Sequence, residues 1–193
     1  MDPLIQLYSE QGLPLEGQGA SKSDVLGKAL LHGTSHIWIW QMRAAEIDIL
    51  LQQRARGKLV WPNRLDISAA GRINLGESPL TAAVREAGEE LNLEVSNGDL
   101  RFIGVHRGYF IADDRSWTAN EIRWLYSLYL PHQKDFVVRE EEVSSVQWKP
   151  LTEVRSDLQH DERRHLYTQH GNTYFSLVFD NIEAQAHGIL AHH

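Results

Sequence analysis

The sequence predicts an α+β fold in which a mixed β-sheet is held between helices. β-rich runs alternate along the chain with segments whose apolar residues recur at helical spacing. The composition is that of an ordinary globular protein, with 42% hydrophobic and 23% charged residues among 193, and we find no internal repeat or low-complexity tract. We therefore expect a single domain over residues 1–193.

The expected strands are β-rich runs bounded by polar connections and turns. They cover residues 4–8, 35–42, 47–53, 65–70, 100–111, 121–130 and 143–148. A polar loop, residues 112–120, separates the two runs that precede the last strand.

Helical spacing predicts a long helix over residues 79–93, another that begins near Leu151, and a closing helix over 175–190. In the first of these, Ser78 followed by Pro79 is a typical helix start. Its apolar residues repeat as they do on one helix face: Leu80, Ala83, Val84, Ala87 and Leu91.

Charge limits the class of binding partner. The formal net charge is -7 and no basic block occurs anywhere in the chain. Nucleic-acid binding needs a cationic face that displaces counterions from phosphates, so we expect no nucleic-acid partner. A small phosphorylated substrate remains compatible with the acidic balance, because a bound divalent cation reverses the local potential.

Membrane and secretion signals are absent from the sequence. No run of about eighteen apolar residues occurs, so we expect no membrane span. The first residues lack a basic stretch followed by an apolar segment, so we expect no signal peptide. Cysteine is absent, which excludes disulfides, thiolate metal sites and thiol nucleophiles. A reducing cytoplasm is the expected location.

Three glutamates give the expected helix over 79–93 a chemical function. Glu86, Glu89 and Glu90 stand at i, i+3 and i+4, so their carboxylates share one helix face. Like charges this close repel unless a cation lies among them, and a hard divalent cation prefers oxygen ligands. A glutamate pair alone is more often a solvated surface, because exposed glutamates are common.

The residues around the three glutamates support a built site. Arg85 can hold a carboxylate such as Glu77 in a two-point fork. Gly71 and Gly76 let the backbone turn tightly just before the helix.

Residues 71–93 resemble the Nudix box, G-x5-E-x7-R-E-U-x-E-E-x-G-U, where U is a bulky aliphatic residue. Two positions depart from it: Ala87 replaces a bulky aliphatic residue, and Asn92 replaces the glycine that ends the helix. The second change is mild, because Asn is the next-best residue for a left-handed position at a helix end. The matching positions are Gly71, Glu77, Arg85, Glu86, Glu89, Glu90 and Leu93.

The resemblance implies the Nudix fold, an α/β/α sandwich whose box forms a loop, a helix and a loop at the active site. It also implies hydrolysis of a diphosphate linkage in a nucleoside-diphosphate-type small molecule, in which water attacks phosphorus while Mg2+ or Mn2+ neutralises the developing charge. The implied metal ligands are the main-chain carbonyl of Ala70 together with Glu86, Glu89 and Glu90, and Arg85 is implied to orient these carboxylates.

A further carboxylate from a later loop supplies a ligand or the general base in this family. We favour Glu142, with Glu140 second, because the triplet 140–142 stands directly before an expected strand. A solvated loop is an equal alternative for these residues.

Residues 28–32, 50–54, 58–62 and 66–71 are similar to the isopentenyl-diphosphate-isomerase-like branch of the family, and the likeness runs from about residue 4 to residue 158. In that branch Arg54 and Lys58 would face the diphosphate. Surface solvation is the alternative for both, since most basic side chains are simply exposed.

True isomerases use a cysteine and a metal bound largely by histidines. Here Ala70 occupies the cysteine position, Arg72 occupies one histidine position, and an upstream histidine position falls near Val25. His32 matches, and a packing role is the stronger interpretation of it. A chain with no thiol and an incomplete histidine set is not expected to isomerise isopentenyl diphosphate. Isomerase activity is kept only as an alternative, beside a catalytically silent domain that binds a nucleotide.

Two tryptophans lie in expected loops. Trp61 and Trp117 could stack on a nucleobase, and Trp117 lies in a polar loop where a large ring has less structural reason. Core packing is the usual role of such rings. A homodimer through the N-terminal segment and the closing helix is also open, although no pattern in them demands it.

Overall fold

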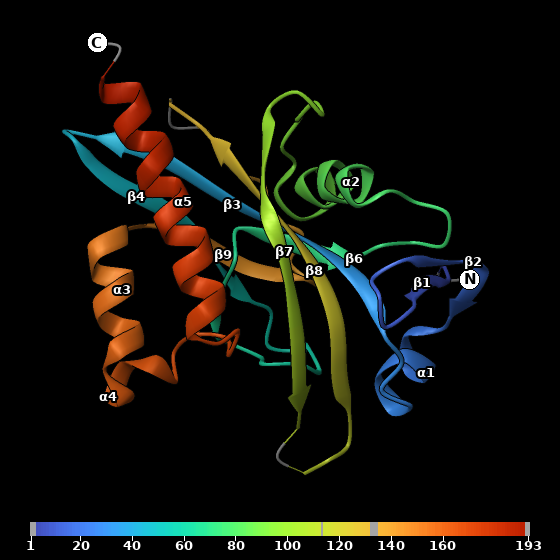
Figure 1. Ribbon diagram of the computed structural model, residues 1–193. Helices are drawn as coiled ribbons and strands as arrows, with labels where there is room; N and C mark the ends of the chain where they lie inside the picture. Colours follow the sequence, from blue (N-terminus) through green and yellow to red (C-terminus); the bar gives the residue numbers. More distant parts are fainter. Residues whose placement is uncertain (1–2, 113, 132–134, 192–193) are drawn as a thin grey trace.

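The structure is a computed structural model that describes residues 3–112, 114–131 and 135–191 (Figure 1). The strands are β1 (Ile5–Tyr8), β2 (Pro14–Ala20), β3 (His32–Arg43), β4 (Glu46–Arg54), β5 (Leu65–Asp66), β6 (Ala69–Arg72), β7 (Leu100–Ile111), β8 (Thr118–Tyr129) and β9 (Val143–Pro150). The helices are α1 (Lys22–Gly27), α2 (Pro79–Leu91), α3 (Leu151–Gln159), α4 (Asp161–Arg164) and α5 (Asn172–Leu190).

Strand β3 is the centre of the mixed sheet. It runs parallel to β8 along one edge, and on the other edge it pairs antiparallel with β6 and β4. The pairing of β3 with β4 extends only from Trp40 opposite Ile49 to Arg43 opposite Glu46. Beyond that point the two strands have different partners: β6 pairs with β3, while β5 and β9 pair with β4.

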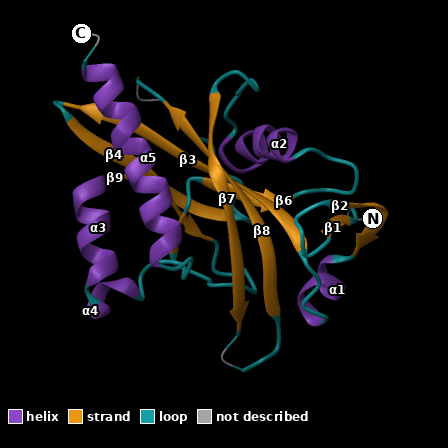
Figure 2. Ribbon diagram, in the orientation of Figure 1, coloured by secondary structure: helices purple, strands orange, loops and turns teal. Residues whose placement is uncertain are grey.

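Alternation along β3 divides the core into two layers. Trp38 and Trp40 point to one face and pack in a cluster with residues of α3 and α5. Ile37 and Ile39 point to the other face and pack with apolar residues of α2. Helices therefore cover both faces of the sheet (Figure 2), and the expected α/β/α sandwich is confirmed.

Helix α2 has the ends that the sequence predicts. The Ser78 hydroxyl accepts a hydrogen bond from the backbone N–H of Thr81, and Pro79 is the first helical residue. Asn92 follows the last helical residue in the left-handed region, with φ 51°. Ala87 is fully buried beneath the helix.

The expected strand 65–70 is divided into β5 and β6. The reason is Ser68, whose hydroxyl donates to the Leu50 carbonyl at 2.6 Å and accepts from the Ile39 N–H at 2.8 Å. These bonds take the place of a strand ladder where the chain crosses from β4 to β3.

Other elements begin earlier than expected or have no strong pattern. β8 begins at Thr118, which shortens the loop expected over 112–120; residue 113 lies outside the described residues. β2, α1 and α4 were not predicted, because β2 contains Gly17 and Gly19 and the two helices are very short.

Helix α5 closes the core on the side of Trp38. Tyr174, Val178, Phe179 and Ile182 form its buried face. Nowhere in the described ranges does a helix combine the length and apolar character needed to cross a membrane.

Candidate functional site

Arg85 fixes the loop that leads into α2. Its Nε and one terminal nitrogen donate to the two oxygens of Glu77, both at 2.9 Å. The same terminal nitrogen donates to the Arg72 carbonyl at 2.9 Å. The predicted two-point fork is confirmed, and it joins the helix to β6.

The Glu86 carboxylate lies against the backbone of β6. It is 9% exposed and accepts a hydrogen bond from Arg85 at 2.6 Å. A β-carbon at Gly71 would overlap its carboxylate atoms. Gly71 is thus required for close approach rather than for a positive φ angle.

Glu90 is the most enclosed of the three glutamates on α2. It is 5% exposed, and its Oε2 accepts from the Ala70 N–H at 3.0 Å and from Gln52 at 3.5 Å. Burial, together with the neighbouring charge of Glu86, raises the pKa of Glu90 to about 8. Glu89 is more open, with a side chain 46% exposed, 3.4 Å from Arg85.

In the ranges that the structure describes, no three aspartate, glutamate or histidine side chains converge closely enough to hold a metal ion. Protein donors engage the carboxylates instead: Arg85 bonds to Glu86, and Lys58 forms an ion pair with Glu142.

The chemistry of the donor set nevertheless fits a hard cation. Burial and neighbouring charge raise the pKa values of Glu86 and Glu90, so these paired carboxylates favour a proton or another cation between them. The Gln52 Oε1 beside them is buried and accepts no hydrogen bond. These oxygens are the ones a divalent cation would satisfy.

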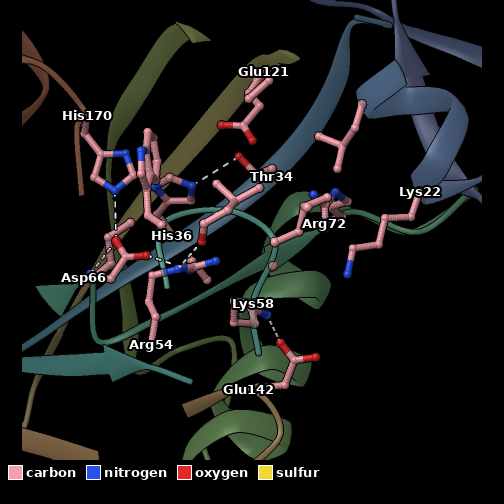
Figure 3. Close-up of a pocket in the computed structure, with 18 of the residues that line it drawn as sticks. Lys22, Thr34, His36, Arg54, Lys58, Asp66, Arg72, Glu121, Glu142 and His170 are labelled. Atoms are coloured by element: carbon pink, nitrogen blue, oxygen red, sulfur yellow. Dashed lines mark hydrogen bonds and ion pairs between the residues drawn. The ribbon is translucent and has the colours of Figure 1, made fainter. Parts of the chain in front are cut away.

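A cavity of about 460 Å³ opens beside the carboxylates (Figure 3). Ala70, Gly71 and Arg72 of β6 form one part of its wall. The rest includes cationic, acidic and imidazole side chains from several elements: Lys22, Thr34, His36, Arg54, Lys58, Asp66, Glu121, Glu141, Glu142 and His170.

The two cations predicted to contact the diphosphate both line this cavity, and both are held by protein partners. Arg54 lies 2.8 Å from the Asp66 carboxylate and donates through Nε to the Val60 carbonyl at 2.9 Å. Lys58 is paired with Glu142. Glu142 therefore lies at the cavity, whereas Glu140 is exposed and does not contribute to its wall.

Histidines form the far wall of the cavity. His170 is 8% exposed, and its Nε2 is hydrogen-bonded to Asp66 at 2.9 Å. Burial alone would raise the pKa of Asp66, but the bond from His170 and the charge of Arg54 hold it well below its usual range. His36 is buried and hydrogen-bonded to the Tyr174 hydroxyl at 2.8 Å.

Sequence reasoning did not find this far wall. His170 lies 104 residues after Asp66, and backbone bonds of Leu65 with Leu166 and Thr168 bring its segment to the cavity. The available signal was Asp66, an acidic residue inside an expected strand.

The structure corrects the expected setting of Trp117. Its side chain is 7% exposed and packs against Phe110 and Trp61, with ring centroids 5.5 and 6.2 Å away. The ring is buried because the chain enters β8 immediately after it. Trp61 lines the cavity, whereas Trp117 does not.

The structure shows where the residues at two of the isomerase positions, Ala70 and His32, lie. Ala70, at the cysteine position, lines the cavity. His32 is fully buried and its Nδ1 is hydrogen-bonded to the Leu30 carbonyl at 2.9 Å, while its Nε2 lies 3.8 Å from Glu121. Its contacts agree with the packing interpretation.

Comparison with known proteins gives a family and a fold. The family model for the NUDIX domain matches residues 32–170. Nudix hydrolase 3 of Arabidopsis thaliana is 31% identical over 134 residues, which is 68% of this chain but 17% of the plant protein. Isopentenyl-diphosphate Delta-isomerase of Citrobacter koseri is 29% identical over 153 residues, which is 78% of each chain.

Solved structures support the same fold. A Deinococcus radiodurans protein matches with a TM-score of 0.59 at 17% identity, covering 90% of this chain and 96% of its own. The NUDIX domain of Shewanella oneidensis NrtR, complexed with ADP ribose, matches with a TM-score of 0.57 at 17% identity, covering 78% of this chain and 87% of its own.

Proposed function

The chain belongs to the Nudix family, and on that premise we propose that it hydrolyses a diphosphate linkage in a nucleoside-diphosphate-type small molecule, with Mg2+ or Mn2+ as cofactor. One observation carries the proposal: Glu86 and Glu90 lie buried together beside the cavity, and their pKa values are raised. An apolar or neutral pair at these positions would destabilise the folded protein less than two buried carboxylates do. The carboxylates therefore suit a reaction that depends on a bound cation.

We assign the cofactor to Glu86, Glu89, Glu90, Glu142 and the Ala70 carbonyl. When bound, it would neutralise charge that gathers on the diphosphate oxygens. Arg85 orients this set, because it holds both Glu77 and Glu86. On binding, the carboxylate oxygens of Glu86 and Glu142 that Arg85 and Lys58 do not engage would contact the cation.

Glu142 is the proposed general base. Burial alone would raise its pKa, but the hydrogen bond and charge of Lys58 hold the pKa of Glu142 below its ordinary value. The carboxylate is therefore ionised at neutral pH, which is the state that accepts a proton from water. Its place at the cavity wall is compatible with a water molecule between it and a bound diphosphate.

The nucleotide part of the proposed substrate rests on the cavity and on one relative. The related NrtR domain was solved with ADP ribose. Trp61 lines the cavity here, and an indole face is a sequence-tolerant platform for a nucleobase. We assign the stacking contact to Trp61 in place of Trp117.

Isomerase chemistry is the second candidate, because one relative is an isopentenyl-diphosphate isomerase. The chain has no cysteine, and Ala70 and Arg72 supply neither the thiol nor the imidazole of the resemblance. Incubation of the protein with isopentenyl diphosphate in D2O tests this candidate, and deuterium uptake into the carbon skeleton would support it.

Phosphate release from a panel of nucleotides and nucleotide sugars, with Mg2+ or Mn2+, tests the proposed hydrolysis. The third candidate is a catalytically silent domain that binds a nucleotide. Calorimetry on the same panel distinguishes it, because such a domain would show tight binding and no turnover. A cytoplasmic location and a homodimer complete the proposal; light scattering over a range of protein concentrations measures the latter.

A further inference from the structure

Arg72 is a cation in the cavity wall whose guanidinium has no hydrogen-bond or ion-pair partner among the residues that the structure describes. Its Nε is buried and makes no hydrogen bond, and no carboxylate in the described ranges lies within ion-pair distance of its guanidinium. Figure 3 shows dashed contacts from Arg54 to Asp66 and from Lys58 to Glu142, and none to Arg72.

The backbone position of Arg72 is set by strand pairing and does not belong to a loop. Residue 72 pairs with Thr34 of β3, and its carbonyl accepts a hydrogen bond from Arg85. It directly follows Gly71, against which the Glu86 carboxylate rests. Arg72 therefore has a fixed backbone next to the Gly71–Glu86 contact, and it lines the cavity.

Three acidic groups near Arg72 form ion pairs with other cations. Glu86 is bonded to Arg85 at 2.6 Å, Glu142 is paired with Lys58, and Glu121 is paired with Arg123 at 2.8 Å. Arg72 is half-buried, and a charge held partly away from water without a partner is destabilising. The missing partner of Arg72 is thus best supplied by an anionic ligand.

We infer that Arg72 is the main anion-binding residue of the cavity and that it donates to phosphoryl oxygens of the substrate's diphosphate. Arginine suits this role, because its planar fork bonds two phosphate oxygens at once. Arg54 and Lys58 then contribute mainly by holding Asp66 and Glu142. This inference rests on the diphosphate class of the proposed substrate and adds the residue that selects it.

Thermal unfolding with methylene diphosphonate, whose P–C–P link resists hydrolysis, tests the inference without any turnover. The Tm is measured with and without the ligand, in EDTA and in Mg2+, for wild type, for Arg72→Met and for the control Arg56→Met. Arg56 is an exposed arginine that does not line the cavity. We expect the ligand to raise the Tm of wild type and Arg56→Met by about 2 °C or more in Mg2+, and to leave the Tm of Arg72→Met unchanged. A full shift in Arg72→Met, or none in wild type, would overturn the inference.

Arg72→Lys keeps the experiment decisive if Arg72→Met does not fold. Lysine retains the charge but loses the fork, so we expect less than half of the wild-type shift. A full wild-type shift with Arg72→Lys contradicts the inference. Hydrolysis measured on the same proteins separates the two proposals. If wild type binds the diphosphonate but turns over no substrate, the proposed hydrolysis fails and the role of Arg72 stands. If wild type turns substrate over while Arg72→Met binds the diphosphonate as well as wild type does, the role of Arg72 fails and the proposed hydrolysis stands.

Discussion

The carboxylate of Glu86 rests on the α-carbon side of Gly71 so closely that a β-carbon there would overlap it. Gly71→Ala must therefore push Glu86 away from β6 or shift the strand. We expect a loss of about 1–3 kcal/mol in the free energy of unfolding, as for overpacking elsewhere. We also expect a large loss of metal-dependent turnover, and urea denaturation with activity assays measures both.

Gly88→Ala is the matched control for Gly71→Ala. Gly88 lies in the same helix, is exposed, and has no atom within 4 Å of an added β-carbon. Alanine should stabilise the helix by about 0.5–1 kcal/mol and leave turnover intact. Equal behaviour of the two variants would contradict the role assigned to Gly71.

Glu90 makes the stability of the metal-free protein depend on pH. Burial raises the pKa of Glu90 to about 8 in the folded protein, against an ordinary value of 4.5. Because the folded pKa is raised, the stabilising contribution is fully present below about pH 4.5 and is lost as the pH rises through about 8. Each pKa unit corresponds to ~1.4 kcal/mol.

The Glu90→Gln variant isolates this dependence, because glutamine keeps the shape and does not titrate. In EDTA, the stability of wild type relative to Glu90→Gln should fall between about pH 4.5 and pH 8. Mg2+ should reduce this fall, since it competes with the proton. Parallel stability curves for the two proteins would show that Glu90 ionises normally.

Asp66 is a structural anchor of the far wall. It is buried and bonded to both Arg54 and His170. Asp66→Asn leaves the Arg54 guanidinium, whose side chain is 15% exposed, without its charged partner, so we expect a loss of about 3 kcal/mol. Asp180→Asn, at an exposed carboxylate 2.7 Å from Arg155, should cost less than about 1 kcal/mol. Chemical denaturation compares them, and a similar cost at both sites would refute the anchoring role.

The two tryptophans should separate binding from stability. Trp61→Ala removes a ring from the cavity wall, so we expect KM to rise about tenfold with kcat little changed. Trp117→Ala removes a buried ring and should lower the free energy of unfolding by about 3 kcal/mol. A larger KM effect from Trp117 than from Trp61 would return the stacking role to Trp117.

Local patterns predicted the part of the site that lies in one segment. The spacing of Glu86, Glu89 and Glu90, the cap at Ser78 and the left-handed end at Asn92 all depend on neighbours in the sequence. The structure agrees with them because helix periodicity and capping are local properties.

The remaining part of the site depends on contacts between distant segments. The bond between Asp66 and His170 crosses 104 residues, and no periodicity encodes it. Arg72 is visible in the sequence only as a departure from the isomerase pattern. Its lack of a partner follows from the pairing of Glu86, Glu121 and Glu142 with other cations, which only the three-dimensional arrangement reveals.

The most direct test of the proposed hydrolysis is the rate of phosphate release from the nucleotide panel by wild type and Glu90→Gln, each with Mg2+, with Mn2+ and with EDTA. We expect wild-type turnover that requires the metal, and a reduction of about 100-fold or more in Glu90→Gln at an unchanged fold. No metal-dependent turnover of any panel member by well-folded wild type, or full activity in Glu90→Gln, would contradict the account.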